Sequence, residues 1–244
     1  MLTRHHVVLG LLCSFIPGSA IAETDPVLAI LFITGCGIGL VLPDIHMKRP
    51  RTSRFRMVAW WIVQTGTWIC LPVMCRVYRR LLKTACEPDD KRLTHSIPGI
   101  FFYFSILSGI AYIPLFLFKN IIPAPMVMGF LGGLLTGMLL HLTEDLCTRK
   151  GITPVYPFDG TKIVGSIRPC DVLDNRILRY HIHHGTILFF FLVFLSAAHW
   201  PVFDLAAVSI AGMGICTLSM VYMSDVRIEC SENRIPDLAE GISA

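Results

Sequence analysis

The stretch IIPAPMVMGFLGGLLTGMLLHLTED, from Ile121 to Asp145, decides the fold of this chain. Its apolar part is long enough to approach the roughly 30 Å hydrocarbon core of a bilayer. His141 and Asp145 stand four residues apart, so on a helix their side chains share one face about one turn apart. An imidazole inside an apolar run is costly in a membrane unless it is paired or functional. The stretch therefore predicts a membrane helix whose end carries two side chains able to hold one divalent ion.

The composition extends this prediction to the whole chain. Hydrophobic residues make up 54% of the 244 residues and charged residues 16%, against roughly 45–50% apolar residues in soluble domains. The mean hydropathy is +0.63. The longest polar stretch, 143–185, is short for an independent soluble core. We expect an all-α, polytopic membrane helical bundle, with a single domain over 1–223 and a polar, disordered cytosolic tail over 224–244.

Seven apolar segments approach the length of a membrane span, and the third of them is ambiguous. Basic residues flank it on both sides, and it contains three of the four tryptophans together with Pro72, which is typical of an interfacial or re-entrant helix. We expect six spanning helices plus one interfacial or re-entrant helix, or seven spans if the third segment crosses. The segments are 7–22, 26–43, 57–75, 97–118, 121–142, 186–200 and 202–223.

The loop charges predict which ends face the cytoplasm, because Lys and Arg concentrate in cytoplasmic loops. Arg4 precedes the first segment, and the loop after it carries only Glu23 and Asp25. The second segment then returns inward and leads into a basic run over 48–56. If the third segment does not cross, the polar clusters at the segment ends all lie at the cytoplasmic face of the inner membrane.

Each of these polar clusters can also be explained by an ordinary structural role, such as capping a helix. Asp44 and His46 lie two residues apart after Pro43, where an Asp is more often a cap or turn residue than a ligand. Ser96 and Pro98 fit a helix start, but that pattern leaves His95 unexplained.

Other histidines and the cysteines carry weaker signals. The His5-His6 pair fits the basic start of a signal-like segment, and histidines 181, 183 and 184 precede an apolar segment, where such side chains are commonly solvated. The nine cysteines are scattered singly with no C-x-x-C pair, so zinc-finger spacing and a disulfide framework are unsupported. Structural thiols are the favoured interpretation.

Three strings together resemble the YdjM/YbcI-type family of membrane-bound metal-dependent hydrolases. They are VLPDIH at 41–46, THS at 94–96 and HLTEDLCTRKGITPVYPF at 141–158. The family has an early histidine on its first helix, a Leu-Pro-Asp-Ile-Asp-His segment and a His-Arg-Gly-x-Thr-His-Ser segment. It also has a His-x-x-x-Asp segment followed by Thr, Gly, Pro and Trp-Pro. Order and approximate spacing agree over about the first 160 residues.

The resemblance implies a set of metal ligands or neighbours of the metal. It also implies that the first segment is retained, although Ala20-Ile21-Ala22 fits a signal-peptidase site, because a helix that carries a ligand cannot be removed. This chain departs from the family where His46 replaces a second Asp and where Asp90 replaces a His. Both replacements are still competent ligands. The implied set is His6 or His5, Asp44, His95, His141 and Asp145, and His46 and Asp90 are further candidate ligands at the positions of departure.

Such a site favours a membrane-bound metal-dependent hydrolase, in which a divalent ion, zinc or manganese, activates water. Asp44, His141 and Asp145 are the expected catalytic positions, and Glu144 is a weak candidate base, more simply a solvated carboxylate. Basic loops would draw an anionic small molecule or a membrane lipid, with a phosphoester as the bond cleaved; no nucleic acid is expected. The alternative is a metal- or proton-coupled transporter or a non-catalytic metal-binding membrane protein.

Overall fold

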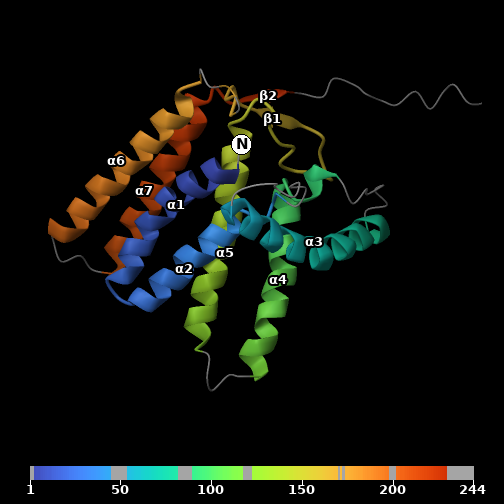
Figure 1. The fold of residues 1–244 in the computed structure, drawn as a ribbon, viewed down its shortest axis with the longest axis horizontal. Coiled ribbons are helices and arrows are strands. Elements are labelled where there is room, and N and C mark those ends of the chain that lie inside the picture. The colour runs from blue at the N-terminus through green and yellow to red at the C-terminus, as the bar shows by residue number, and fades with distance from the viewer. Residues whose placement is uncertain are drawn as a thin grey trace, which may run out of the picture.

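The protein is an all-α membrane helical bundle with a small two-stranded sheet at one end (Figure 1). The computed structural model describes residues 3–44, 54–81, 90–117, 123–169, 171, 174–197 and 202–229. The helices are α1 (Thr3–Ala22), α2 (Pro26–Gly39), α3 (Arg54–Leu81), the short 3₁₀ helix η1 (Lys91–Leu93), α4 (Ile97–Leu117), α5 (Ala124–Leu146), α6 (Arg176–Ala197) and α7 (Val202–Met223).

Helix length separates strong candidate spans from shorter apolar helices. In the described part of the chain, apolar stretches long enough to cross a membrane lie within α1, α3, α5, α6 and α7. Helix α2 has 14 residues, and the corresponding stretch of α4 is Ile97–Ile113. The predicted membrane bundle is confirmed, whereas the count of six crossings stays a prediction.

Helices α2 and α5 pack so closely that glycine is required between them. A Cβ on Gly35 would stand 2.2 Å from the carbonyl oxygen of Phe130, and one on Gly39 would stand 2.2 Å from that of Leu134. Gly133 and Gly137 of α5 meet the backbone of α2 in the same way. This small-xxx-small spacing lets membrane helices approach to backbone contact. The close fit sets the end of α2 beside the last turns of α5.

Helix α1 lies between α2 and the α6–α7 pair (Figure 1). Its buried Cys13 and Ile16 join a core with Leu140 of α5, Phe191 of α6 and Cys216 of α7. An apolar core between α1, α6 and α7 therefore fixes the position of α1, including the start of the helix where His6 lies.

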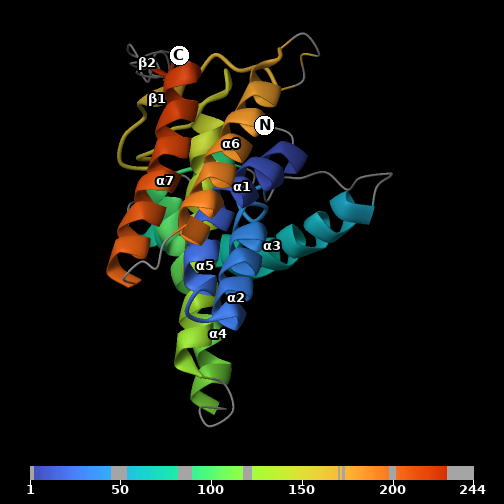
Figure 2. The ribbon, with the colours of Figure 1, turned by 90° about the vertical axis from the view of Figure 1, so that its left-hand side faces the viewer.

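The orientation of α3 bears on the ambiguous third segment. Residues Arg56–Arg80 are long and apolar enough to span a membrane. In both Figure 1 and Figure 2, however, α3 points away from the direction shared by α4 and α5. Trp61 and Trp68 are exposed on its surface, as is typical of a helix at the membrane interface. The arrangement favours the interfacial alternative, and the topology itself stays a prediction.

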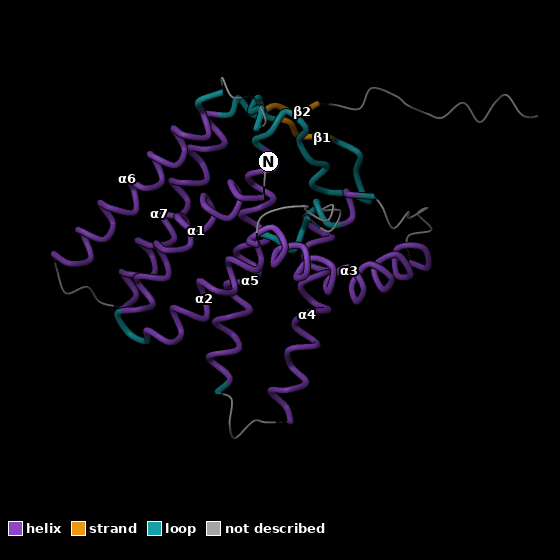
Figure 3. The backbone as a smooth tube through the Cα atoms, viewed as in Figure 1, coloured by secondary structure: helices purple, strands orange, loops and turns teal. Residues whose placement is uncertain are grey.

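The long polar stretch folds over one end of the helices, where Figure 3 shows the loops and both strands together. Strand β1 (Lys162–Val164) pairs antiparallel with β2 (Arg227–Glu229), with Lys162 opposite Glu229. The carbonyl of Ser224 accepts a hydrogen bond from the backbone N–H of Ser166. Ordered chain thus extends past residue 223, where the polar tail was expected to begin, and the tail from residue 230 lies outside the described residues.

Candidate metal centre

Five side chains from distant parts of the sequence meet at the end of the bundle over which the polar stretch 143–185 folds. They are His6 of α1, Asp44 just after α2, His95 just before α4, and His141 and Asp145 of α5. Sequence patterns explain where three of them lie. Ser96 caps the start of α4, accepting a hydrogen bond from the Gly99 N–H, and the four-residue spacing on α5 puts His141 and Asp145 on one face.

The donor atoms of these side chains face one another at short range. Asp145 lies at the middle: its Oδ1 is 3.3 Å from Nε2 of His6, and its Oδ2 is 3.3 Å from Nε2 of His95. Nε2 of His141 is 3.7 Å from Asp145 Oδ2 and 3.8 Å from Asp44 Oδ1. Asp44 Oδ1 is in turn 3.7 Å from Nε2 of His95.

Each imidazole is held through its other ring nitrogen. Nδ1 of His6 lies 2.6 Å from a carboxylate oxygen of Glu144. Nδ1 of His141 donates to the carbonyl oxygen of Leu40 at 2.7 Å, and Nδ1 of His95 lies 3.1 Å from the carbonyl oxygen of Lys91. Such partners on the outer nitrogen are characteristic of metal-binding histidines, because they fix the tautomer and the direction of the ring.

The inner nitrogens suit a metal ion. Nε2 of His6, His95 and His141 is buried in each case and faces carboxylate oxygens of Asp44 or Asp145 at 3.3–3.8 Å, as donor atoms arranged around an ion would. Ligand atoms at roughly 2.0–2.1 Å from one tetrahedral ion stand about 3.4 Å apart, close to the separations seen here. Two three-residue donor groups share His141, one with His6 and Asp145 and the other with Asp44 and His95. The residues present therefore fit a divalent metal ion.

Electrostatics also favour a cation at this position. Burial opposes ionisation of Asp44, but a hydrogen bond from His95 and the charge interactions with His141 and His6 together outweigh burial and hold the pKa of the carboxyl below its usual range. Burial likewise disfavours the charged form of His95, yet its hydrogen bonds to Asp145 and Asp44 raise its pKa. The same carboxylates that stabilise positive charge on an imidazole would stabilise a bound metal ion.

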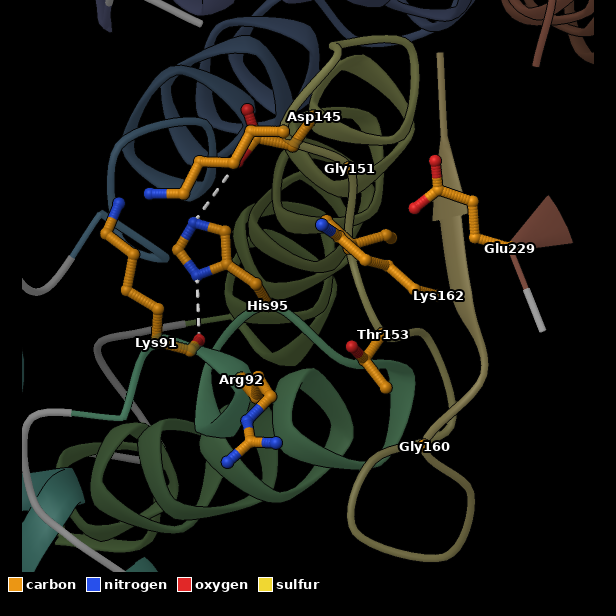
Figure 4. A pocket seen from close by; sticks show the side chains of 11 residues that line it. Lys91, Arg92, His95, Asp145, Gly151, Thr153, Gly160, Lys162 and Glu229 are labelled. Atoms are coloured by element: carbon orange, nitrogen blue, oxygen red, sulfur yellow. Dashed lines mark hydrogen bonds and ion pairs between the residues drawn. The ribbon is translucent and has the colours of Figure 1, made fainter. Parts of the chain in front are cut away.

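The centre opens into a cavity of about 470 Å³ whose walls are basic. His95 and Asp145 form its inner end, and Figure 4 shows Lys162 reaching into it from β1. The side chains of Asp44 and Asp145 retain 15% exposure, whereas His6 and His141 are fully buried, so the centre is reached from the carboxylate side. The remaining basic lining residues are Lys91, Arg92 and Lys150.

One predicted ligand, Asp90, is not brought to the centre, and another, His46, cannot be placed. Asp90 lies in neither donor group; its carboxylate caps η1 and binds the guanidinium of Arg92 at 2.7 Å. The hydrogen bonds from Arg92 hold the pKa of Asp90 below its usual range against the opposing effect of burial. His46 lies outside the described residues.

The structure also distinguishes His6 from His5 and assigns Glu144 a contact that the sequence did not predict. His6 points into the centre, whereas the ring of His5 lies 5.8 Å from that of His181. The interpretation of Glu144 as a solvated carboxylate is wrong, because it is buried and bound to His6. No local pattern could have indicated this contact, since it joins residues 138 positions apart.

Fold and site together define a polytopic membrane protein with a candidate metal centre at one end of its helices. The sequence model of the YdjM inner membrane protein family matches residues 1–224, and the chain belongs to this family. No curated protein and no solved structure matches the chain.

Proposed function

We propose that this protein is a membrane-bound hydrolase that depends on a divalent metal ion, zinc or manganese, and cleaves a phosphoester at the cytoplasmic face of the inner membrane. The main support for the proposal is that a cluster of potential metal ligands lies next to a basic cavity. Three buried imidazole nitrogens and two carboxylates meet at the inner end of a cavity whose walls are basic.

The ion would be held by Asp44, His95, His141 and Asp145, with His6 at the second oxygen of Asp145. A metal bound in such a site supplies Lewis acidity that makes water a nucleophile near neutral pH. The protein's own residues would orient the ligand rings and exclude bulk water. Glu144 and the carbonyls of Leu40 and Lys91 fix the rings, and burial of His6 and His141 keeps bulk water away from all but the cavity side.

The cavity walls support an anionic substrate. Lys91, Lys150 and Lys162 line the space in front of His95 and Asp145, and Glu229 is paired across from Lys162 in the sheet. A phosphate group entering the cavity would gain charge-assisted hydrogen bonds from these ammonium groups. Because the cavity lies at the ends of apolar helices, a lipid or lipid-linked phosphoester would present its headgroup at this depth.

Metal analysis tests the centre itself. Purified wild-type protein is expected to contain zinc or manganese, and His141→Ala and Asp145→Ala to lose the share bound at this centre. The control is His181→Ala, which removes an imidazole outside both donor groups and should keep the metal. Equal metal content in all four proteins would overturn the proposed centre.

Turnover of a lipid panel tests the reaction. Wild-type protein loaded with metal should release phosphate or a phosphorylated headgroup from an anionic phospholipid, and Lys162→Ala should raise KM about tenfold with a smaller change in kcat. Ion flux in reconstituted vesicles without any turnover would favour the transporter alternative instead.

A further inference from the structure

A second group of potential ligands lies inside the bundle, apart from the centre described above. Cys13 of α1, His184 of α6 and Cys216 of α7 each offer one donor atom, and these three atoms lie within 4.8 Å of one another. All three side chains are buried, with exposures of 3%, 1% and 0%. Both thiols are free and contact each other. Figure 1 shows the three helices that carry them side by side, and each contacts the other two.

His184 is oriented like the histidines of the first centre. Its Nδ1 donates to the carbonyl oxygen of Tyr180 on the preceding turn at 2.8 Å. Its Nε2 is buried and has no hydrogen-bond partner in the described part of the chain. The expectation that this histidine is solvated is therefore wrong. A buried imidazole with one nitrogen fixed and the other unsatisfied, next to two thiols, has the arrangement of a metal ligand.

We propose that Cys13, His184 and Cys216 form a second metal site, specific for a thiophilic ion, with Zn(II) as the ion that the charge balance favours. Thiolate donors select soft or borderline ions over the hard ions that carboxylates prefer. Two thiolates and a neutral imidazole exactly offset the two charges of Zn(II), whereas Cu(I) would leave one net negative charge buried among apolar helices. On binding, each thiol releases its proton to solvent and its sulfur forms the bond to the metal.

The position of the site gives it a structural role. It joins α1, α6 and α7 at one point, and Cys13 follows His6 by seven residues, which is about 10 Å along a helix. An ion bound there would hold the helix that carries His6 against the α6–α7 pair. This role does not depend on hydrolysis at the first centre.

Cobalt substitution separates the two sites, because only the second contains sulfur. Protein stripped of metal and loaded with Co(II) should show an intense thiolate-to-cobalt charge-transfer absorption, which Zn(II) then removes by displacement. The absorption should persist in the double variant His141→Ala, Asp145→Ala and in the control Cys70→Ser, whose thiol is buried but lies outside the donor group. It should vanish in Cys13→Ser and in Cys216→Ser.

Several outcomes would overturn this proposal. One is the absence of a charge-transfer band in cobalt-loaded wild type, a measurement that requires no variant to fold. A band that survives both cysteine substitutions would assign the thiolate elsewhere. A Cys13–Cys216 disulfide found by mass spectrometry in metal-free wild type purified under reducing conditions would make the pair a redox couple instead.

Discussion

At the scale of single residues, the three histidines of the first centre differ in what holds their outer nitrogens. Backbone carbonyls hold His95 and His141, whereas a side-chain carboxylate holds His6. A carbonyl cannot be removed by substitution of a side chain, but the carboxylate of Glu144 can. Glu144 is therefore the residue through which the role of these outer contacts is most directly tested.

Substitution of Glu144 by Ala should weaken metal binding at the first centre by about 10- to 100-fold, because partners of the outer histidine nitrogen tune ligand orientation and basicity. Glu144→Gln should keep most of the affinity, since its amide oxygen still accepts a hydrogen bond from His6. Competition against a chelator of known affinity measures both.

The matched control for this prediction is Glu23→Gln, which changes an exposed carboxylate at the far end of α1 and should leave the affinity unchanged. Equal affinities in wild type and Glu144→Ala would show that the contact to His6 does not orient the ligand.

At the scale of the elements, the contact between α2 and α5 sets the distance from Asp44 to His141. Two neighbouring glycines on α5 allow the effect of close helix packing on stability to be measured apart from the effect of helix propensity. A Cβ on Gly133 would stand 2.0 Å from the carbonyl oxygen of Phe32, whereas a Cβ on Gly132 would meet nothing within 4 Å. The two residues share one helix but face different surroundings.

Gly133→Ala should lower the free energy of unfolding by about 1–3 kcal/mol, the usual cost of inserting atoms into a packed interface. Gly132→Ala should be neutral or slightly stabilising, because Ala is the better helix former. Thermal unfolding in detergent, with the metal content of each variant, checks both. Similar melting temperatures for the two variants would contradict the close packing of α2 on α5.

The orientation of α3 leads to a prediction about topology. If α3 lies at the membrane interface, cysteines introduced at Arg54 and Arg80 should both be labelled by an impermeant reagent from the cytoplasmic side, as should one at Lys150. A cysteine at Asp204 should be labelled only from outside. All four positions are exposed. Labelling of Arg54→Cys and Arg80→Cys from opposite sides would show that α3 spans.

At the scale of the whole molecule, the first centre gathers side chains from residue 6 to residue 145, so it exists only when helices from both ends of this range are packed together. Helix α1 contributes His6 to this centre and Cys13 to the second donor group. The first segment, which has the pattern of a signal sequence, is thus part of the core of the bundle.

We therefore expect the mature protein to retain its first segment. Intact-mass measurement of protein purified from membranes should give a chain that includes His6, and a variant that starts at Glu23 should lose metal from both sites because α1 is missing. A mature chain starting at Glu23 that still binds metal would refute this expectation.

Composition, segment lengths and motifs were enough to predict the class of the fold and most residues of the first centre. Hydropathy and segment length require a membrane bundle, because apolar helices of this length have their lowest free energy in lipid. His95, His141 and Asp145 lie at the ends of apolar segments, where their polar side chains indicated a candidate site. The family motifs added Asp44 and an early histidine, and the family match over residues 1–224 agrees with that resemblance.

The packing of the helices was needed to show which histidine of the first pair enters the centre and that Glu144 holds it. It was also needed to show that Asp90 binds Arg92 instead of joining the donor groups. It also brought together Cys13, His184 and Cys216, which the sequence scatters over 204 positions. The physical reason is that periodicity fixes which residues share a face of one helix, whereas the partner of that face depends on how helices pack. Here the packing is set by glycine contacts such as those between α2 and α5.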